Sequence, residues 1–570
     1  AGAAAAAAGK LVVTGTLAMQ GGGFRALAAD TGFFSGLLAA AARREGSRPP
    51  SLASSGLLDN ICQMSTNSGS SWFMAQLIYS PSFVQLVERM AATPWRAAHN
   101  FAHYWTEPWL RATRIDVPFF NVTGNLARAV VRALLGSADA DTILLARFLL
   151  ATGVTWTNFV NTLLNSTSGL NESVQMGSSV NAWAEGKLWI VDHTAVFPQG
   201  GTVGRFYEAI LGKETVAYRE LDEASIGDKV NFQPARISII LGAGVDSAAP
   251  LPYIPPTAPP FTRRLNYTAR NQTAGGVQLS TLSSPLDFRS LMRDAGKLPV
   301  SRVVGASSAF LGTAATLGPV PAQAEALLSA SLTPWISSAP EGRAFHEADE
   351  LIATVKKGQE SLPFALNGLA NGAVRGVIDG GFCEGTGIAE AVATGADEVV
   401  VILNSNASNN PYFVQLLFPG GLDHANESPA NAFSKPAALF PVFTAPSAAA
   451  VRKAFADDFH LLRVTPRAKF LHALAVGTLH VRTAENRFWG IEANRNVTLH
   501  IVNIASQLKI GLLEDFNHYN VLVQEVLSTL MNGWNRRFVE SVLLPMFLGS
   551  SDRFTSKTGT VDSEIGTLFV

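Results

Sequence analysis

The stretch DNICQMSTNSGSSW, residues 59–72, decides how this chain is interpreted. It begins with a short, mostly apolar segment and continues through a serine- and glycine-rich turn to Trp72. A strand, a tight turn carrying one serine and a following helix together form a nucleophile elbow, in which a strained turn presents the serine side chain. Ser-Gly-Ser strings are common in loops, so this interpretation needs support from elsewhere in the chain.

Two other segments supply that support. The glycine-rich QGGGFRA, residues 20–26, follows an apolar run over 10–17 and precedes an Ala- and Leu-rich run over 26–42. This pattern predicts a strand, a glycine turn and a helix, an arrangement that directs backbone N–H groups and a helix N-terminus toward an anion. VIDGG, residues 377–381, places Asp379 at the end of another predicted strand.

In this order the three segments resemble the catalytic domain of the cytosolic (group IV) phospholipase A2 family and, more distantly, the patatins. That family has a Gly-Gly-Gly-aromatic-Arg segment, a Gly-x-Ser-Gly-Ser elbow often followed closely by Trp, and, after a long insertion, an Asp that completes a Ser–Asp dyad. The long insertion suits the phospholipase branch, whereas Asp-Gly-Gly is closer to the patatins. The resemblance is specific over residues 10–80 and 370–405.

The resemblance implies an α/β fold, a three-layer α/β/α patatin-like domain with a large cap or lid insertion. We expect residues 1–570 to form one domain, with 81–370 as the insertion that contains the cap or lid. Residues 371–570 should complete the core sheet and add a C-terminal hairpin and helices. The residues themselves predict further strands and a C-terminal helical segment from their apolar patterns, at 236–241, 398–403, 478–483, 497–504 and 522–548.

The resemblance also assigns a role to each residue of the motifs. Ser68 would be the nucleophile and Asp379 its general base, Gly22 and Gly23 the oxyanion hole, and Arg25 the group that binds a substrate phosphate. Two alternatives stay open at this point: Asp379 as an ordinary Asp-Gly-Gly turn residue, and Arg25 as half of a structural salt bridge. A dyad of this kind predicts catalysis without a metal or cofactor.

One position departs from the family's pattern. The elbow's leading glycine, two residues before the nucleophile, is Thr66 here, and a β-branched side chain crowds a tight turn. The serines at 65, 70 and 71 are rivals for the nucleophile, of which Ser70 is the strongest because it lies two residues from Ser68. Whether Thr66 tunes the turn or disables it is not decided by the sequence.

The predicted function is that of a serine acyl hydrolase, which cleaves phospholipid or lysophospholipid esters through an acyl-enzyme. A lipid acyltransferase and a catalytically inactive lipid-binding or structural protein are the alternatives. The net charge is −1 and charged residues make up 15% of the chain, so nothing indicates nucleic-acid binding. Contact with a membrane or micelle would be peripheral, through apolar and aromatic surface. The dense aromatics of residues 95–120 fit either a core or a lipid-facing cap.

Sequons for N-glycosylation are more frequent than chance would give, which favours a secreted protein or one in a lysosomal or vacuolar lumen over a cytoplasmic one. The two cysteines, Cys62 and Cys383, fit either buried free thiols or one disulfide. The sequons lie at Asn121, Asn165, Asn171, Asn266, Asn271, Asn406, Asn426 and Asn496.

Overall fold

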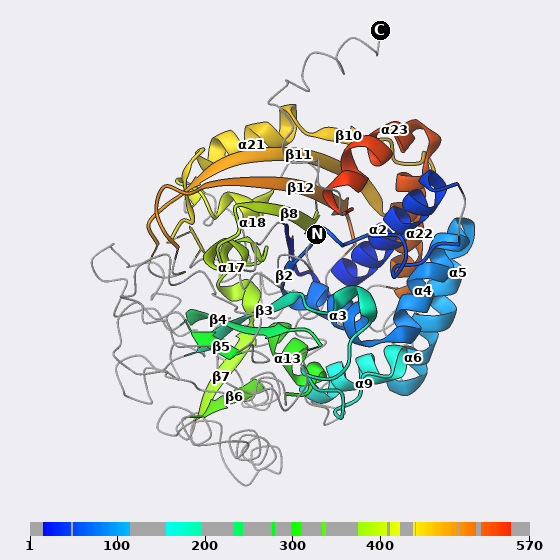
Figure 1. The fold of residues 1–570 in the computed structure, drawn as a ribbon, viewed down its shortest axis with the longest axis horizontal. Coiled ribbons are helices and arrows are strands. Elements are labelled where there is room, and N and C mark those ends of the chain that lie inside the picture. The colour runs from blue at the N-terminus through cyan, green and yellow to red at the C-terminus, as the bar shows by residue number, and fades with distance from the viewer. Residues whose placement is uncertain are drawn as a thin grey trace, which may run out of the picture.

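The computed structural model of the chain shows a mixed α/β architecture (Figure 1). It describes residues 15–46, 49–113, 156–196, 232–242, 276–279, 298–309, 333–337, 374–406, 411–421, 437–438, 440–486, 489, 491–508 and 515–548.

The strands join into one sheet, in the order β10-β11-β12-β8-β1-β2-β3-β4-β5, with β7 also pairing β3, β6 pairing β7 and β9 pairing β11. Its middle, from β12 to β3, is parallel, and both ends are antiparallel. The strands are β1 Thr16–Met19, β2 Gln63–Thr66, β3 Leu188–Val196, β4 Phe232–Ile240, β5 Gly276–Leu279, β6 Thr333–Ser337, β7 Val374–Asp379, β8 Glu398–Ser405, β9 Phe443–Ala445, β10 His460–Leu462, β11 Leu471–Thr483 and β12 Asn496–Ser506.

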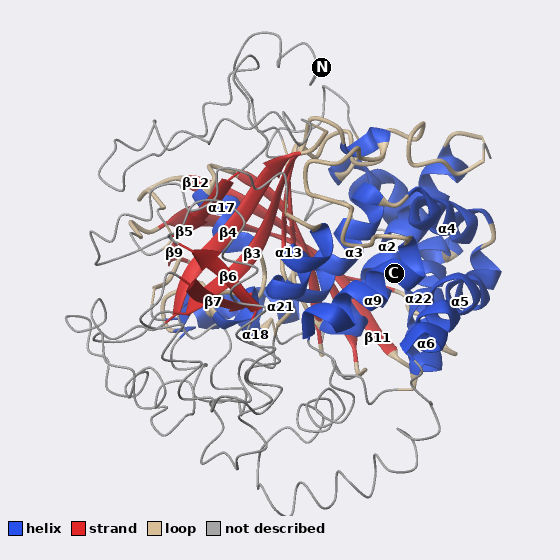
Figure 2. Ribbon diagram, turned by 90° about the horizontal axis from the view of Figure 1, so that it is seen from below, coloured by secondary structure: helices blue, strands red, loops and turns tan. Residues whose placement is uncertain are grey.

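Helices cover both faces of this sheet (Figure 2). The α-helices are α2 Gly23–Arg44, α3 Ser68–Tyr79, α4 Pro81–Ala92, α5 Ala97–Phe101, α6 Glu107–Thr113, α9 Trp156–Ser168, α13 Val300–Ser307, α17 Ile388–Ala393, α18 Tyr412–Gln415, α21 Ala448–Asp457, α22 Phe516–Met531 and α23 Arg536–Phe538. Short 3₁₀ or π segments are η1 Pro94–Arg96, η2 Ala102–Thr106, η3 Ala182–Ala184, η8 Gly380–Phe382, η9 Gly533–Asn535, η10 Val539–Leu543 and η11 Leu544–Met546.

Two hydrophobic cores lie against the opposite faces of the sheet. Along β8, Val400 and Ile402 belong to the core shared with α2, α3 and α22, whereas Val399 and Val401 belong to the core shared with α17, α18 and α21. Successive side chains of a strand point to opposite faces, so a strand covered by helices on both sides is apolar throughout. This explains why the run VVVIL in β8 carries no alternation.

The structure confirms several of the predicted elements. The patterns at 478–483 and 497–504 belong to the long antiparallel pair β11 and β12, and the strand predicted at 398–403 is β8. The apolar run predicted as a strand over 10–17 is strand only from Thr16, and residues 10–14 lie outside the described part. The helix predicted after the elbow is α3, which begins at Ser68 itself.

Described parts of the predicted insertion, residues 81–370, contribute to the sheet and to the core. Strands β3, β4, β5 and β6 all come from this region and are paired within the one sheet. A lid within 81–370 therefore stays a prediction, and residues 114–155 and 338–370 lie outside the described part.

The aromatic segment 95–120 is mainly core where it is described. Phe101, Trp105 and Trp109 are buried, and Trp109 packs against Phe516 with ring centroids 4.7 Å apart. Trp95 differs, with 74% of its surface exposed. Residues 119 and 120 lie outside the described part.

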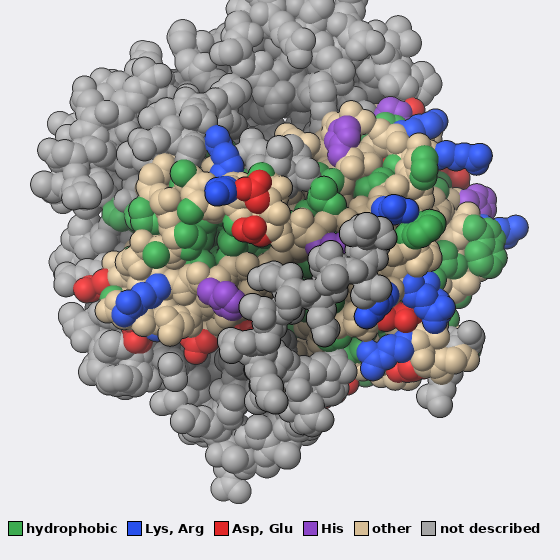
Figure 3. Space-filling model, turned by 90° about the horizontal axis from the view of Figure 1, so that it is seen from above, with side chains coloured by type: hydrophobic (Ala, Val, Ile, Leu, Met, Phe, Trp, Pro, Cys, Tyr) green, Lys and Arg blue, Asp and Glu red, His purple; other side chains and the backbone are tan. Residues whose placement is uncertain are grey.

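The described surface exposes few large hydrophobic side chains besides Trp95. Trp534 is 76% exposed, and the Arg463 guanidinium lies over its ring at 4.6 Å. Figure 3 shows basic and hydrophobic side chains interspersed on the right of the molecule, the side on which Figure 1 labels α5 and α23. Among the described residues, the helices are too short or too polar to span a membrane.

Candidate active site

The stretch 59–72 folds as the elbow pattern predicts. Strand β2 ends at Thr66, Asn67 is extended, and helix α3 begins at Ser68. Ser68 has a φ of +50°, in the left-handed region that side chains other than glycine seldom occupy. Its backbone is thus strained at the point where a strand turns sharply into a helix, and such strain concentrates at functional sites.

The glycine-rich turn after β1 packs directly against this elbow. A Cβ added to Gly69 would lie 2.2 Å from the Gly23 carbonyl oxygen and 2.5 Å from its nitrogen. A Cβ on Gly21 would lie 2.6 Å from the Cβ of Ser68. Only residues without side chains allow this approach, so the glycines of the two motifs bring the turns into contact.

Asp379 reaches Ser68 from strand β7, on the side of β3. Thr66 is in register with Val191 in the parallel pair of β2 and β3, and β3 continues beyond the end of β2. There, His193 is paired with Asp379 at the end of β7, which runs antiparallel to β3. The sequence predicts Asp379 at the end of a strand, and it lies there, at the end of β7. This strand is antiparallel to β3 and runs toward the elbow.

The two side chains form a hydrogen bond. Ser68 Oγ donates to Asp379 Oδ2 at 2.9 Å, while Asp379 Oδ1 accepts the N–H of Gly381 at 2.8 Å. Burial raises the pKa of Asp379 to about 7, although these two hydrogen bonds act in the opposite direction. The carboxyl therefore titrates near neutrality while it faces a serine hydroxyl. Asp379 also accepts the hydrogen bond from Gly381 within its own Asp-Gly-Gly turn. It can therefore be a turn residue and a candidate base at the same time.

Two rival serines of the elbow also pair with aspartates. Ser70 Oγ lies 2.6 Å from Asp30 Oδ2, and Ser65 Oγ lies 3.1 Å from an oxygen of Asp192. Both Ser65 and Ser70 are fully buried, whereas Ser68 is 9% exposed. A substrate has to reach the nucleophile, so exposure and the strained backbone, rather than the presence of a carboxylate, distinguish Ser68.

Thr66 is part of the elbow's hydrogen bonding. Its Oγ1 accepts from Ser71 Oγ at 3.0 Å and from the indole N–H of Trp189 at 3.0 Å. The residue ends strand β2, where a β-branched side chain is favoured. The structure therefore accommodates a threonine at this position of the elbow, and its hydroxyl ties the strand to α3.

Gly22 and Gly23 lie at the N-terminus of α2, where Gly23 approaches Gly69 of the elbow. Gly22 is the N-cap of α2 and Gly23 its first residue, with φ values of +144° and +57°. N–H groups in the first turn of a helix have no acceptor within the helix, and the helix dipole is positive at this end. Both glycines can therefore present N–H groups to a negative charge beside the elbow.

The structure places Arg25 beneath this turn rather than in the open. The side chain is 3% exposed, and its guanidinium donates to the carbonyl oxygens of Asn404 at 2.7 Å and Leu508 at 3.3 Å, and to the amide oxygen of Asn406. Its Nε has no hydrogen-bond partner among the described residues. Burial lowers its pKa to about 10, so it remains charged at neutral pH. Its described hydrogen-bond partners are thus neutral oxygens, which does not match the salt-bridge alternative.

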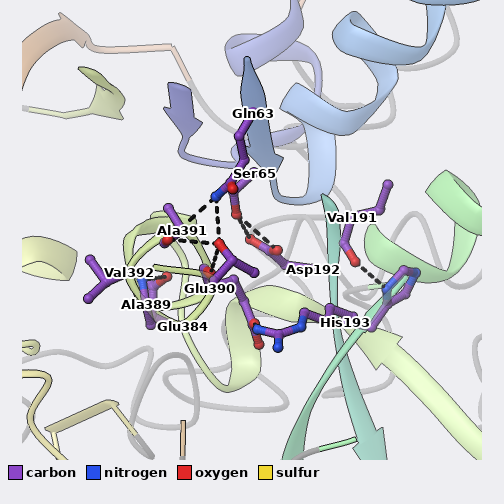
Figure 4. Close-up of polar contacts among 12 residues, drawn as sticks. Gln63, Ser65, Val191, Asp192, His193, Glu384, Ala389, Glu390, Ala391 and Val392 are labelled. Carbon is purple, nitrogen blue, oxygen red and sulfur yellow. Dashed lines mark hydrogen bonds and ion pairs between the residues drawn. The ribbon is translucent and has the colours of Figure 1, made fainter. Parts of the chain in front are cut away.

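A buried acidic cluster near Ser65 gave no signal in the sequence (Figure 4). Asp192, Glu384 and Glu390 are all buried, and Glu390 pairs with Arg236 at 2.5 Å. Burial raises the pKa of Asp192, and neighbouring Glu390 and Glu384 raise it further. Burial also raises the pKa of Glu384 to about 7. Side chains from three distant segments meet here, so no local pattern could have predicted the cluster.

The two cysteines are not joined. Cys383 is buried and Cys62 partly buried, and neither forms a disulfide. Of the two interpretations left open by the sequence, the disulfide is therefore wrong. Burial raises the pKa of the Cys383 thiol, which keeps it protonated and unreactive.

Comparison of the chain with protein-family models, with curated proteins and with solved structures found no match.

Proposed function

We propose that this protein is a serine acyl hydrolase with Ser68 as nucleophile and Asp379 as general base. One observation carries the proposal: the hydroxyl of a strained elbow serine donates to a buried carboxyl at 2.9 Å, beside a glycine turn at a helix N-terminus. Nucleophile, base and oxyanion donors are the parts that acyl transfer requires.

In the proposed reaction, Asp379 takes the proton of Ser68 Oγ as this oxygen attacks the ester carbonyl. The N–H groups of Gly22 and Gly23 stabilise the oxyanion of the tetrahedral intermediate. Asp379 then gives its proton to the departing alcohol, which leaves an acyl-serine. Water attacks this acyl-enzyme and yields its proton to Asp379, and the free fatty acid leaves as Ser68 regains its proton.

Phospholipid and lysophospholipid esters are the proposed substrates, on the basis of the motif resemblance alone. The buried position of Arg25 changes the role we propose for it. Its positive charge lies beneath the glycine turn, where it supports the oxyanion site, and a substrate phosphate would reach it only after its contacts to Asn404, Asn406 or Leu508 open.

A fluorophosphonate probe and a lipid assay test this proposal together. The wild-type protein should be labelled on Ser68, as mapped by mass spectrometry, and should release fatty acid from lysophospholipid micelles or phospholipid vesicles. Adding a lipid alcohol and following the acyl products separates hydrolysis from acyl transfer. A folded protein that is neither labelled nor active would instead be a binding protein.

The activity should depend on pH through Asp379. Only the ionised carboxylate can take the proton from Ser68, and burial raises its pKa to about 7. We expect kcat/KM to fall about tenfold per pH unit below this pKa and to level off above it. A profile measured from pH 5 to 9 on a soluble ester checks this, and a rate independent of pH across 5–8 would contradict Asp379 as the base.

We also propose a secretory or lysosomal location, with peripheral contact to lipid. The described sequon asparagines at 165, 171, 406 and 496 are exposed, which glycosylation requires. The sequons at 121, 266, 271 and 426 lie outside the described residues.

A further inference from the structure

Helix α13, Val300–Ser307, is tied to the elbow although it lies far away in the sequence. The indole N–H of Trp72, on the elbow helix, donates to Ser308 Oγ at 2.8 Å, and the indole N–H of Trp156 donates to the Gly305 carbonyl at 2.8 Å. The C-terminal end of α13 is therefore fixed beside α3, within the region that the sequence suggested as a cap.

Ser307 makes the closest of these contacts. Its buried hydroxyl accepts the backbone N–H of Ser68 at 3.1 Å and donates to the Asp192 carbonyl at 2.7 Å. A carbonyl oxygen can only accept, so the single hydroxyl proton of Ser307 points to Asp192. Its lone pairs are then free to receive the N–H of Ser68.

These two bonds connect the nucleophile to the strand that positions the base. Asp192 precedes His193 on β3, and His193 is the residue paired with Asp379 across the β3–β7 ladder. Ser307 thus links the strained residue of the elbow to the segment of β3 beside Asp379. A shift of either element has to break one of these hydrogen bonds.

We propose that Ser307 is a positioning residue, which holds Ser68 at the distance from Asp379 that proton transfer needs. This inference rests on the proposed function. It also gives α13 a fixed role: the helix supports the elbow from within the predicted insertion, rather than moving as a lid. Holding Ser68 N–H on Ser307 further keeps that amide away from the oxyanion, which leaves the role to Gly22 and Gly23.

The test compares Ser307→Ala with Ser301→Ala. Ser301 is also buried on α13, but its Oγ has no hydrogen-bond partner among the described residues. In the Ala variant of Ser307, α13 keeps its bonds to Trp72 and Trp156, so we expect it to fold. Its kcat for ester hydrolysis and its rate of fluorophosphonate labelling should fall about 10- to 100-fold, with KM within about twofold, as expected when reacting groups are misplaced.

Rescue separates positioning from general stability. Ser307→Thr keeps the hydroxyl and should recover most of kcat, and Ser301→Ala should match the wild-type protein. A folded Ser307→Ala variant with wild-type kcat would overturn the inference while the hydrolase proposal stands. If Ser307→Ala does not fold, Ser307→Cys replaces it in the test, because its thiol is only a weak hydrogen-bond acceptor. A lowered kcat in the Cys variant supports the inference, and a wild-type kcat overturns it. A folded wild-type protein that neither hydrolyses esters nor reacts with the fluorophosphonate would contradict both the hydrolase proposal and the role of Ser307.

Discussion

Replacing Ser68 with alanine should abolish ester hydrolysis, with kcat reduced by about 10⁴-fold or more. The change removes the atom that attacks the carbonyl, and the remaining groups can only bind and polarise the substrate. Alanine meets the same backbone strain at a φ of +50° as serine does, so the variant isolates the hydroxyl. Fatty-acid release and probe labelling, with the melting temperature as a check on folding, measure the effect.

Ser70→Ala is the matched control, because Ser70 was the strongest rival in the sequence and pairs with Asp30. We expect this variant to lose thermal stability, since it leaves a buried carboxyl without its hydroxyl partner. It should still be labelled at Ser68. Labelling that survives in Ser68→Ala but disappears in Ser70→Ala would move the nucleophile to Ser70.

Asp379→Asn should lower kcat by about 10²- to 10⁴-fold, the usual contribution of a general base. The amide oxygen can still accept the N–H of Gly381, and the amide nitrogen can donate to Ser68 Oγ, so each contact has a replacement although the Ser68 bond reverses direction. The amide cannot take up the proton, however, and the rate should lose its dependence on pH near 7. Steady-state kinetics at pH 6, 7 and 8 measure both effects.

Stability gives an independent readout for the same variant. Burial raises the pKa of Asp379 to about 7 in the folded protein, above the pKa of the same group in the unfolded chain. Ionisation of Asp379 therefore lowers the free energy of unfolding progressively as the pH rises from the unfolded-state pKa through the folded-state pKa. Asparagine carries no charge at any of these pH values. At pH 8 the Asn variant should therefore melt at or above the wild-type temperature although its kcat is strongly reduced. A large loss of stability would assign Asp379 a structural role instead.

Local sequence patterns predicted much of the core and of the candidate site. Short glycine-rich turns and apolar runs specify strand–turn–helix units through backbone sterics and burial, which act over a few residues. On this basis the elbow at Ser68, the glycine turn at 21–23 and the strand ending at Asp379 were all predicted, and the structure brings them together.

Other features depend on contacts that no local pattern encodes. The sequence leaves open whether Thr66 tunes or disables the elbow, and only the structure shows that Trp189 and Ser71 donate hydrogen bonds to its hydroxyl. Arg25 looked available to a phosphate, whereas carbonyl oxygens from residues 404 and 508 enclose it. Both findings involve partners from other strands and helices, whose approach depends on how the whole sheet assembles.

The sequence by itself predicted which turns form and, through the motif resemblance, that Ser68 pairs with Asp379. Tertiary structure decided which of three Ser–Asp pairs is accessible. Ser65 and Ser70 have carboxyl partners too, and only the packing of strands and helices buries them completely while Ser68 stays partly exposed. The elbow is a local property because backbone strain arises within a few residues. Burial and pKa arise from groups that meet only in the folded chain, so the chemistry proposed for Ser68 is a property of the assembled sheet.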